Sequence, residues 1–280
     1  MSKYASMFGT EPAHVTKSNL FGDTSQPVDR TAEIEAWRVS KGPMETSAKR
    51  INFILNGVDV KSLALSNIGD VGGHQVEEAT ECNKCVDAVV TDFAALKEAL
   101  AEPKNLILDA VRFIEDAAKP LGLIEKFKGA KRPDMRTVRA MVKDNVDKAN
   151  DLMISGTKYH IDPFIEGLGD ALATINAIAK DLNNSINALD YVAECCPDKT
   201  VQDFALRRKE MFTKSLALMG MNRSQVDQMT LTCQKNKNFG IELTNVIKPL
   251  IENIMRTAII SDSDDAEAMK QMQLKLKGIL

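Results

Sequence analysis

Apolar residues recur at alternating steps of four and three residues along the middle of the chain. Eight positions share this spacing: Leu168, Leu172, Ile175, Ala179, Leu182, Ile186, Leu189 and Ala193. Such a heptad pattern predicts a long helix with a narrow apolar stripe, which needs partner helices to cover it. The polar residues between these positions, among them Asp181, Asn184 and Asn187, are expected to form the polar face.

The same helical spacing extends back to Thr137 and weakens between residues 156 and 163. Pro163 lacks a backbone N–H and clashes with the preceding turn, so we expect a kink or a break there. With a mild kink, the stretch from Thr137 to Cys195 would form one rod of about 60 residues and roughly 90 Å.

A second stripe near the C-terminus predicts another long helix. Its positions are Val226, Met229, Cys233, Asn236, Gly240, Leu243, Ile247, Leu250 and Ile254. Pro249 lies within this stripe, which predicts a kink near Asn245. Ahead of the stripe, Thr200 is expected to cap a helix that ends at Gly220, and Ser224 to cap the next one. The apolar positions of that earlier helix are Val201, Phe204, Ala205, Phe212, Leu216 and Met219.

Shorter helices are predicted at Thr46–Leu55, Val58–Gly69 and Gln75–Leu100, with a turn at residues 70–73 and another helix start at Pro103. No alternating strand pattern of useful length is present. The sequence therefore predicts an all-α fold, an elongated bundle of long antiparallel coiled-coil-like helices with shorter N-terminal helices.

Three segments are expected along the chain. Residues 1–45 should be mostly disordered, residues 46–260 should form the helical bundle, and residues 261–280 should form a short C-terminal helix or tail. Thr31–Val39 could form a short helix, in which Trp37 is either a docked anchor or part of a free tail.

The composition narrows the function classes. Aromatic residues make up only 5% of the chain and hydrophobic residues 44%, which favours helices packed on helices. The net charge of −3 argues against a dedicated nucleic-acid binder. Neither a secretory signal nor a long uncharged apolar segment is visible, and five cysteines without framework spacing favour the reducing cytoplasm.

Three groups of residues resemble the tellurite-resistance TelA family of toxic-anion-resistance proteins. The first group is Val58-Asp59 with Leu65 and Ile68-Gly69 before a helix from Gln75, and the second is Asp181, Leu189 and Tyr191-Val192. The third and most specific group is Phe204, Arg207-Arg208, Ser215, Ala217, Gln234-Lys235-Asn236-Lys237-Asn238, Ile241-Glu242 and Pro249-Leu250.

The resemblance covers roughly Val58 to Ile260 and has departures. Lys235 and Lys237 replace asparagines of the family pattern, and Ile251 stands where the family has a tryptophan. About one helical turn is missing between Glu242 and Pro249. The family's C-terminal helices are truncated here after Ile260.

This resemblance implies a non-enzymatic helical stress protein, associated with resistance to tellurite and other toxic anions, in the cytoplasm of a bacterium or a phage-infected cell. We expect it to act as a scaffold or partner-binding rod. It needs no cofactor, binds a protein partner and could form a homo-oligomer; no nucleic acid is expected, and a membrane surface is a less favoured partner. Two alternatives remain: an α-helical pore-forming or membrane-remodelling subunit, in which only Leu243–Ile260 could insert, and a structural coiled-coil protein of a virion.

Three candidate sites follow from the residues. Gln234, Asn236, Asn238 and Gly240 would form a polar belt that sets helix register or admits a partner, because a buried Asn needs a hydrogen bond and a glycine lets helices approach closely. Lys128, Lys131, Arg132, Arg136 and Arg139 form a basic run that is either a docking patch or a solvated surface. Cys82 and Cys85 form a C-x-x-C in mid-helix, for which we expect no metal because no matching ligands are spaced nearby.

Overall fold

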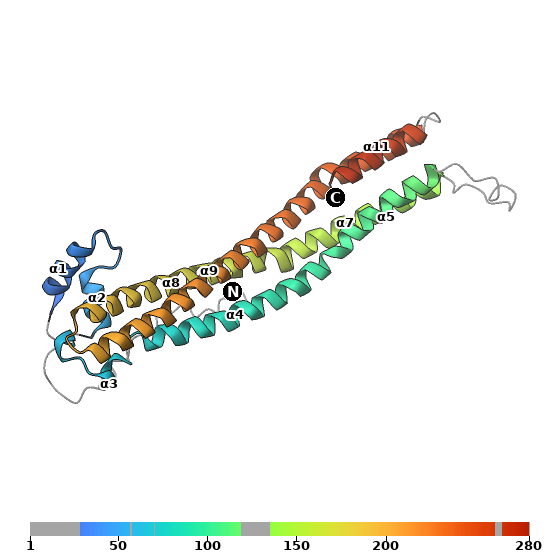
Figure 1. Cartoon of the computed structure of the whole chain (residues 1–280). Helices are drawn as coiled ribbons and strands as arrows, with labels where there is room; N and C mark the ends of the chain where they lie inside the picture. Colours follow the sequence, from blue (N-terminus) through green and yellow to red (C-terminus); the bar gives the residue numbers. More distant parts are fainter. Residues whose placement is uncertain (1–28, 57, 70, 119–134, 261–264, 280) are drawn as a thin grey trace. The chain divides into compact units, whose positions relative to one another are not determined.

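The computed structural model describes residues 29–56, 58–69, 71–118, 135–260 and 265–279. Its helical elements, shown in Figure 1, are α1 Thr31–Lys41, α2 Ala48–Ile54, η1 Val60–Ser62, α3 Leu65–Ile68, α4 Gly73–Ala99, α5 Ala101–Ala118, α7 Met135–Gly156, η2 Thr157–Ile161, α8 Asp162–Cys195, α9 Lys199–Glu242, η3 Leu243–Ile247, α10 Lys248–Ile260 and α11 Asp265–Gly278. No strand occurs among the described residues. The all-α prediction is confirmed.

The chain divides into two compact units, and the division falls inside three helices. Of the described residues, those up to Val89 and those from Gly167 to Gln228 form unit 1, and those from Val90 to Glu166 and from Met229 onward form unit 2. The boundaries therefore interrupt α4, α8 and α9 rather than a linker. The predicted segment boundaries at residues 45 and 260 stay a prediction. The short helix that the sequence allowed at Thr31–Val39 is present as α1, with Ile34 fully buried, and residues 1–28 lie outside the described residues.

In unit 1 the predicted stripe of α8 is buried at every second position, at Leu168, Ile175, Leu182 and Leu189. At the other four predicted positions the preceding residue is the buried one, namely Ala171, Ile178, Ser185 and Val192. Leu172, Ala179, Ile186 and Ala193 are only half-buried. The heptad spacing is therefore correct, but the buried face is centred to one side of the predicted stripe. The smaller residue of the adjacent pair faces inward at Ala171 and Ser185, and the larger one at Ile178 and Val192.

Helix α9 runs through Gly220 without interruption, so the predicted helix end there is wrong. Gly220 is exposed, and a glycine inside a helix costs only about 1 kcal/mol relative to alanine. The inward packing of Phe212, Met219 and Val226 on either side offsets that cost.

The turn before α4 does require its glycine. Gly72 has a φ of +71°, and a Cβ at this position would lie 2.7 Å from Cζ of Phe212. Arg208 Nε donates a hydrogen bond of 2.9 Å to the carbonyl oxygen of Val71. The predicted turn is thereby held against α9 inside unit 1.

In unit 2, α5 and α7 lie side by side (Figure 1), and Asn145 Nδ2 of α7 donates to the carbonyl oxygen of Leu106 at 3.2 Å. Helix α11 packs on α5, where Gln273 and Lys277 contact Glu115 at 3.0 and 2.7 Å. The second predicted stripe is confirmed over this unit, since its positions from Met229 to Ile247 and Ile254 are buried.

Both predicted proline irregularities take the form of a widened turn, not a break. The N–H of Asp162 bonds the carbonyl of Thr157, and the N–H of Lys248 bonds that of Leu243. These i→i+5 bonds define the π-helical segments η2 and η3. Each segment ends two residues before a proline, Pro163 or Pro249.

Candidate functional site

Helix α1 is anchored to the C-terminal end of α8 by the only tryptophan of the chain. The Trp37 ring packs edge-on against Tyr191 with ring centroids 5.3 Å apart, and its indole N–H donates to Glu194 at 2.9 Å. Lys41 pairs with the same carboxylate at 2.7 Å. The hydrogen bond from Lys41, with a further one from Trp37, holds the pKa of the Glu194 carboxyl below its ordinary value. Trp37 is therefore a docked anchor.

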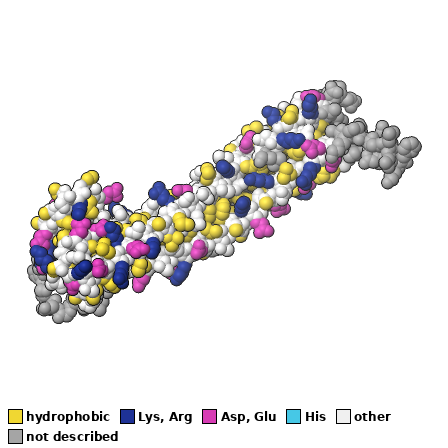
Figure 2. Space-filling view, viewed as in Figure 1, with side chains coloured by type: hydrophobic (Ala, Val, Ile, Leu, Met, Phe, Trp, Pro, Cys, Tyr) yellow, Lys and Arg dark blue, Asp and Glu magenta, His cyan; other side chains and the backbone are white. Residues whose placement is uncertain are grey.

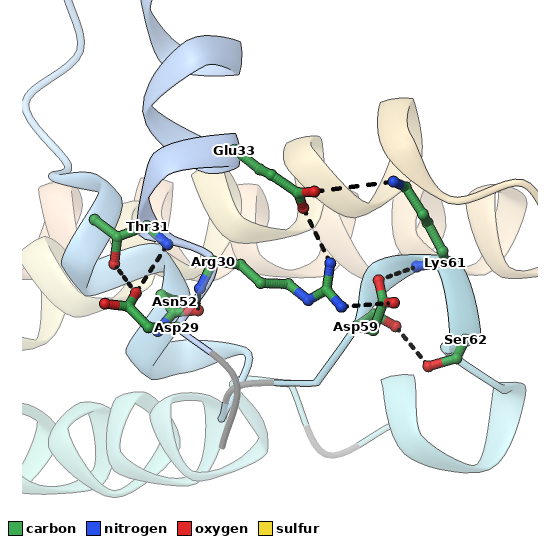
Figure 3. Close-up of polar contacts among 8 residues, drawn as sticks. All are labelled: Asp29, Arg30, Thr31, Glu33, Asn52, Asp59, Lys61 and Ser62. Carbon is green, nitrogen blue, oxygen red and sulfur yellow. Dashed lines mark hydrogen bonds and ion pairs between the residues drawn. The ribbon is translucent and has the colours of Figure 1, made fainter. Parts of the chain in front are cut away.

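Arg30, just before α1, is the centre of a second set of contacts (Figure 3). Its guanidinium group pairs with Glu33 at 3.1 Å and with Asp59 at 2.7 Å. Lys61 lies 3.9 Å from Glu33, and the backbone N–H of Lys61 donates to Asp59. These contacts hold the start of α1 to the segment around η1.

The polar face predicted for α8 is largely covered by the chain leading into α2. Thr46 donates to Asn184 at 2.8 Å and accepts from Asn187 at 2.7 Å. Arg50 donates to Asp181 at 2.7 Å. Thr46 and Asn184 are buried, so this network satisfies polar groups inside unit 1 and is not the solvent-facing surface that the sequence predicts.

A shallow depression lies beside the end of α1. It is lined by Glu35, Arg38, Val39, Gly42, Pro43, Met44 and Glu45. Arg38 spans it through contacts with the Glu35 carboxylate and the Met44 carbonyl. These two contacts of the Arg38 guanidinium group lie within α1 and the loop that follows it.

Helix α9 carries a second, solvent-facing stripe within unit 1, which we name the outer stripe. Its residues are Phe204, Arg207, Met211, Lys214, Leu218 and Met221. They follow one another at alternating steps of three and four. The four apolar side chains are 38%, 48%, 39% and 62% exposed, in chain order. Figure 2 shows that hydrophobic side chains reach the surface between charged ones on the face in view.

The outer stripe is separate from the buried stripe of the same helix. Ala205, Phe212 and Met219 are buried, and each directly follows an outer-stripe residue. Because one residue turns an α-helix by about 100°, the outer stripe points well away from the core. The sequence prediction placed Phe204 on the apolar inner face, whereas the structure exposes it. The signal that was missed is the seven-residue spacing of Phe204, Met211 and Leu218.

The predicted polar belt separates into two halves in unit 2. Gln234 and Asn238 are exposed, whereas Asn236 and Gly240 are buried. Asn236 Nδ2 donates to the Thr232 carbonyl of its own helix at 3.1 Å, so the predicted hydrogen bond to a facing helix is not the one formed. Residues two positions apart on an α-helix are about 200° apart around its axis. Gln234 and Asn238 therefore lie on the side of α9 away from Asn236 and Gly240, and the four residues cannot form one belt.

Gly240 does mark a close helix approach, as predicted. A Cβ at this position would lie 3.1 Å from Cε of Met153 and 3.6 Å from Oγ1 of Thr157.

An ion-pair group in unit 2 is centred on Asp147 of α7, which accepts from Lys143 and from Lys248, the latter at 3.2 Å. Burial alone would raise the pKa of Asp147, but the two lysines hold it below its ordinary value. The ion pair with Lys248 ties α10 to α7.

The basic run is described only in part. Lys128, Lys131 and Arg132 lie outside the described residues. Arg136 is exposed at the start of α7, and Arg139 is half-buried one turn later. The docking-patch hypothesis for this run stays a prediction.

The cysteines have pKa values that disfavour the thiolate. Burial raises the pKa of Cys82 to about 11 and also raises that of Cys85 one turn away. Cys233 is likewise raised by burial to about 11. A thiol with a raised pKa is a poor nucleophile at neutral pH. Across the described part of the chain, His, Cys, Asp and Glu side chains form no cluster of three or more suited to a metal ion.

The chain matches no protein-family model, no curated protein and no solved structure. Within the described ranges, no helix combines the length and the apolar content that a membrane span requires.

Proposed function

We propose that the protein is a non-enzymatic helical scaffold that binds a protein partner, acting in the cytoplasm in a stress response of the TelA type. The observation that carries this proposal is the outer stripe of α9. Four large apolar side chains lie in one row on a helix that is buried in unit 1 through a different face. Rows of exposed apolar residues mark interaction surfaces when they are contiguous, whereas scattered ones do not.

Two further observations support the non-enzymatic part. The carboxyl group of Asp147 has a lowered pKa because it accepts contacts from Lys143 of its own helix and from Lys248 of α10, which together outweigh its burial. The pKa of Glu194 is lowered by contacts from Lys41 and Trp37 of α1, so both carboxylates belong to structural ion pairs. The raised pKa values of Cys82 and Cys233 have burial as their main cause. Groups shifted in these ways stabilise packing. A cysteine that acts as a nucleophile needs a lowered thiol pKa, which is the opposite of the shift at Cys82 and Cys233.

The stress-response part rests on the resemblance of residues 58–260 to the TelA family. Arg208 of its third group ties α9 to the Val71 turn, and Asp181 of its second group accepts from Arg50. The residues that carry the resemblance thus include contacts that hold unit 1 together. A scaffold requires such a rigid frame behind its binding surface.

The test is site-specific photo-crosslinking in bacterial cells that express the full chain. A photoreactive phenylalanine analogue replaces Met211 on the outer stripe, and the same analogue replaces Leu274 of α11, which is 62% exposed, as a control. We expect a protein adduct from position 211 and none from position 274. A second readout is growth on tellurite. Protection by the chain that is lost in Met211→Gln/Leu218→Gln supports the stress role, and no adduct at position 211 contradicts partner binding.

A further inference from the structure

We propose that the outer stripe is the docking surface for an acidic amphipathic helix of a partner protein. This deepens the proposed function and rests on it. The stripe alternates apolar and basic residues: Phe204, Met211, Leu218 and Met221 supply apolar contacts, and Arg207 and Lys214 lie between them. From Phe204 to Met221 the stripe covers 18 residues, and the 17 steps between them span about 25 Å at 1.5 Å per residue.

The spacing fits a helix better than an extended segment. Steps of three and four residues generate the row of holes into which the side chains of a second helix insert. A peptide helix lying in such a row contacts it through its own residues at i, i+3, i+4 and i+7. Met211 and Met221 are unbranched and flexible, so they adapt to the shape of the inserted side chains.

The two charged residues within the row, Arg207 and Lys214, are both basic and favour an acidic partner, while the exposed carboxylates of Asp203 and Glu210 flank the row on one side. Arg207 forms no ion pair with another described residue, and Lys214 pairs only with Glu210 on the same exposed surface, at 2.8 Å. An exposed pair of this kind is weak and exchanges readily for a partner carboxylate. Two cations in line with the apolar residues therefore favour carboxylates that flank the apolar face of the bound helix.

The same charges disfavour a second copy of this chain. In an isologous contact both copies present the same stripe, so Arg207 and Lys214 of one copy would face the same cations of the other.

A bilayer is also disfavoured as the occupant of the outer stripe, because of where the cations lie. Helices that lie in a membrane surface carry cations on the face opposite their apolar residues, whereas here cations and apolar residues share one row.

The probe is a fluorescent three-heptad peptide with leucine at its a and d positions and glutamate at e and g. Control peptides carry glutamine or lysine at e and g. Anisotropy with the full-length protein should give a dissociation constant about tenfold lower for the glutamate peptide than for the lysine peptide. Arg207→Glu/Lys214→Glu should reverse this preference. The matched control Lys180→Glu/Arg223→Glu changes the net charge equally at exposed sites off the stripe and should preserve it.

Apolar contact is tested separately. Met211→Gln/Leu218→Gln should abolish binding, whereas Leu206→Gln, at a residue 50% exposed on the same helix but off the stripe, should not. Equal binding of the acidic and basic peptides overturns the proposal. So does stripe-dependent dimerisation in sedimentation, or stripe-dependent flotation with phosphatidylserine vesicles. If the acidic peptide does not bind but position 211 still crosslinks in cells, this inference fails and the proposed function stands.

Discussion

Replacement of Gly240 tests the closest approach between helices in unit 2. The position lies in the buried stripe of α9, and a Cβ there would stand 3.1 Å from Cε and 3.5 Å from Cβ of Met153. Met153 is itself 1% exposed, so its side chain has little room to retreat. A leucine at position 240 adds three more carbon atoms in this direction.

The expected magnitude follows from two opposing effects. Exchanging glycine for leucine inside a helix gains about 0.5–1 kcal/mol of helix propensity. Overpacking a filled interior typically costs about 1–3 kcal/mol. Gly220 of the same helix provides the matched control, because it is exposed and a Cβ there meets no atom within 4 Å. Gly220→Leu should therefore show the propensity gain alone.

Thermal and urea unfolding, followed by far-ultraviolet circular dichroism, compare the two variants. Gly240→Leu should unfold earlier than Gly220→Leu by a difference of about 1–3 kcal/mol, and about 2–4 °C accompany each kcal/mol in a chain of this size. Identical midpoints for the two leucine variants would refute the close approach. Gly220→Leu falling well below the wild type would refute the assumption that its site is open.

The remaining predictions concern the α1 anchor and the cysteines. Because Trp37 is the only tryptophan, its fluorescence reports the docking of α1 directly, and Glu194→Gln should increase its quenching by acrylamide, with the exposed Glu210→Gln as the unchanged control. Because the pKa of Glu194 is lowered in the folded protein, its contribution to stability is complete above the ordinary glutamate pKa of about 4.3 and is lost as the pH falls through the folded pKa. Acidification should therefore increase the quenching of Trp37 in the wild type at a pH at which the quenching in Glu194→Gln does not yet change. In native protein Cys82 should react with iodoacetamide more slowly than Cys85, because it is buried and its pKa is about 11, and both should react fast in urea; equal native rates would contradict this. Protein purified without chelator should contain no stoichiometric zinc, and one zinc per chain by elemental analysis would overturn the prediction for Cys82 and Cys85.

The sequence predicted the helical fold because heptad spacing is a strong local signal, and it predicted the α9 stripe correctly from residue 226 onward. On α8 it predicted four of the eight inward positions correctly and was one residue off at the other four, for a physical reason. Positions 171 and 172, and 178 and 179, are both apolar, so two stripes one residue apart fit the same pattern. Which of them is buried depends on the helices that pack against α8, and a single helix does not encode that.

The candidate sites were harder to predict because they depend on contacts between distant segments. Thr46 lies 138 residues from Asn184, and no spacing rule links a threonine in a loop to an asparagine on a helix. The outer stripe was readable as a seven-residue repeat, but reading it required knowing that Phe212 and Met219, not Phe204 and Leu218, face the core. The four residues of the predicted polar belt do not share one face, because residues two apart on a helix point to different sides.

Pro163 and Pro249 show which part of a helix irregularity the sequence predicts and which part depends on packing. Pro163 and Pro249 cannot donate a hydrogen bond, and each clashes with the carbonyl four residues earlier. A straight helix would leave that carbonyl both crowded and unpaired. Adding one residue to the preceding turn moves the carbonyl aside and lets the following N–H groups bond five residues back, as Asp162 and Lys248 do. The rule therefore predicts where the helix is disturbed, while the packing around it decides whether the chain breaks or widens. Buried Ile161 and Ile247 lie at the ends of the two π segments, so a break at either point would expose an apolar side chain that the widened turn keeps in the core.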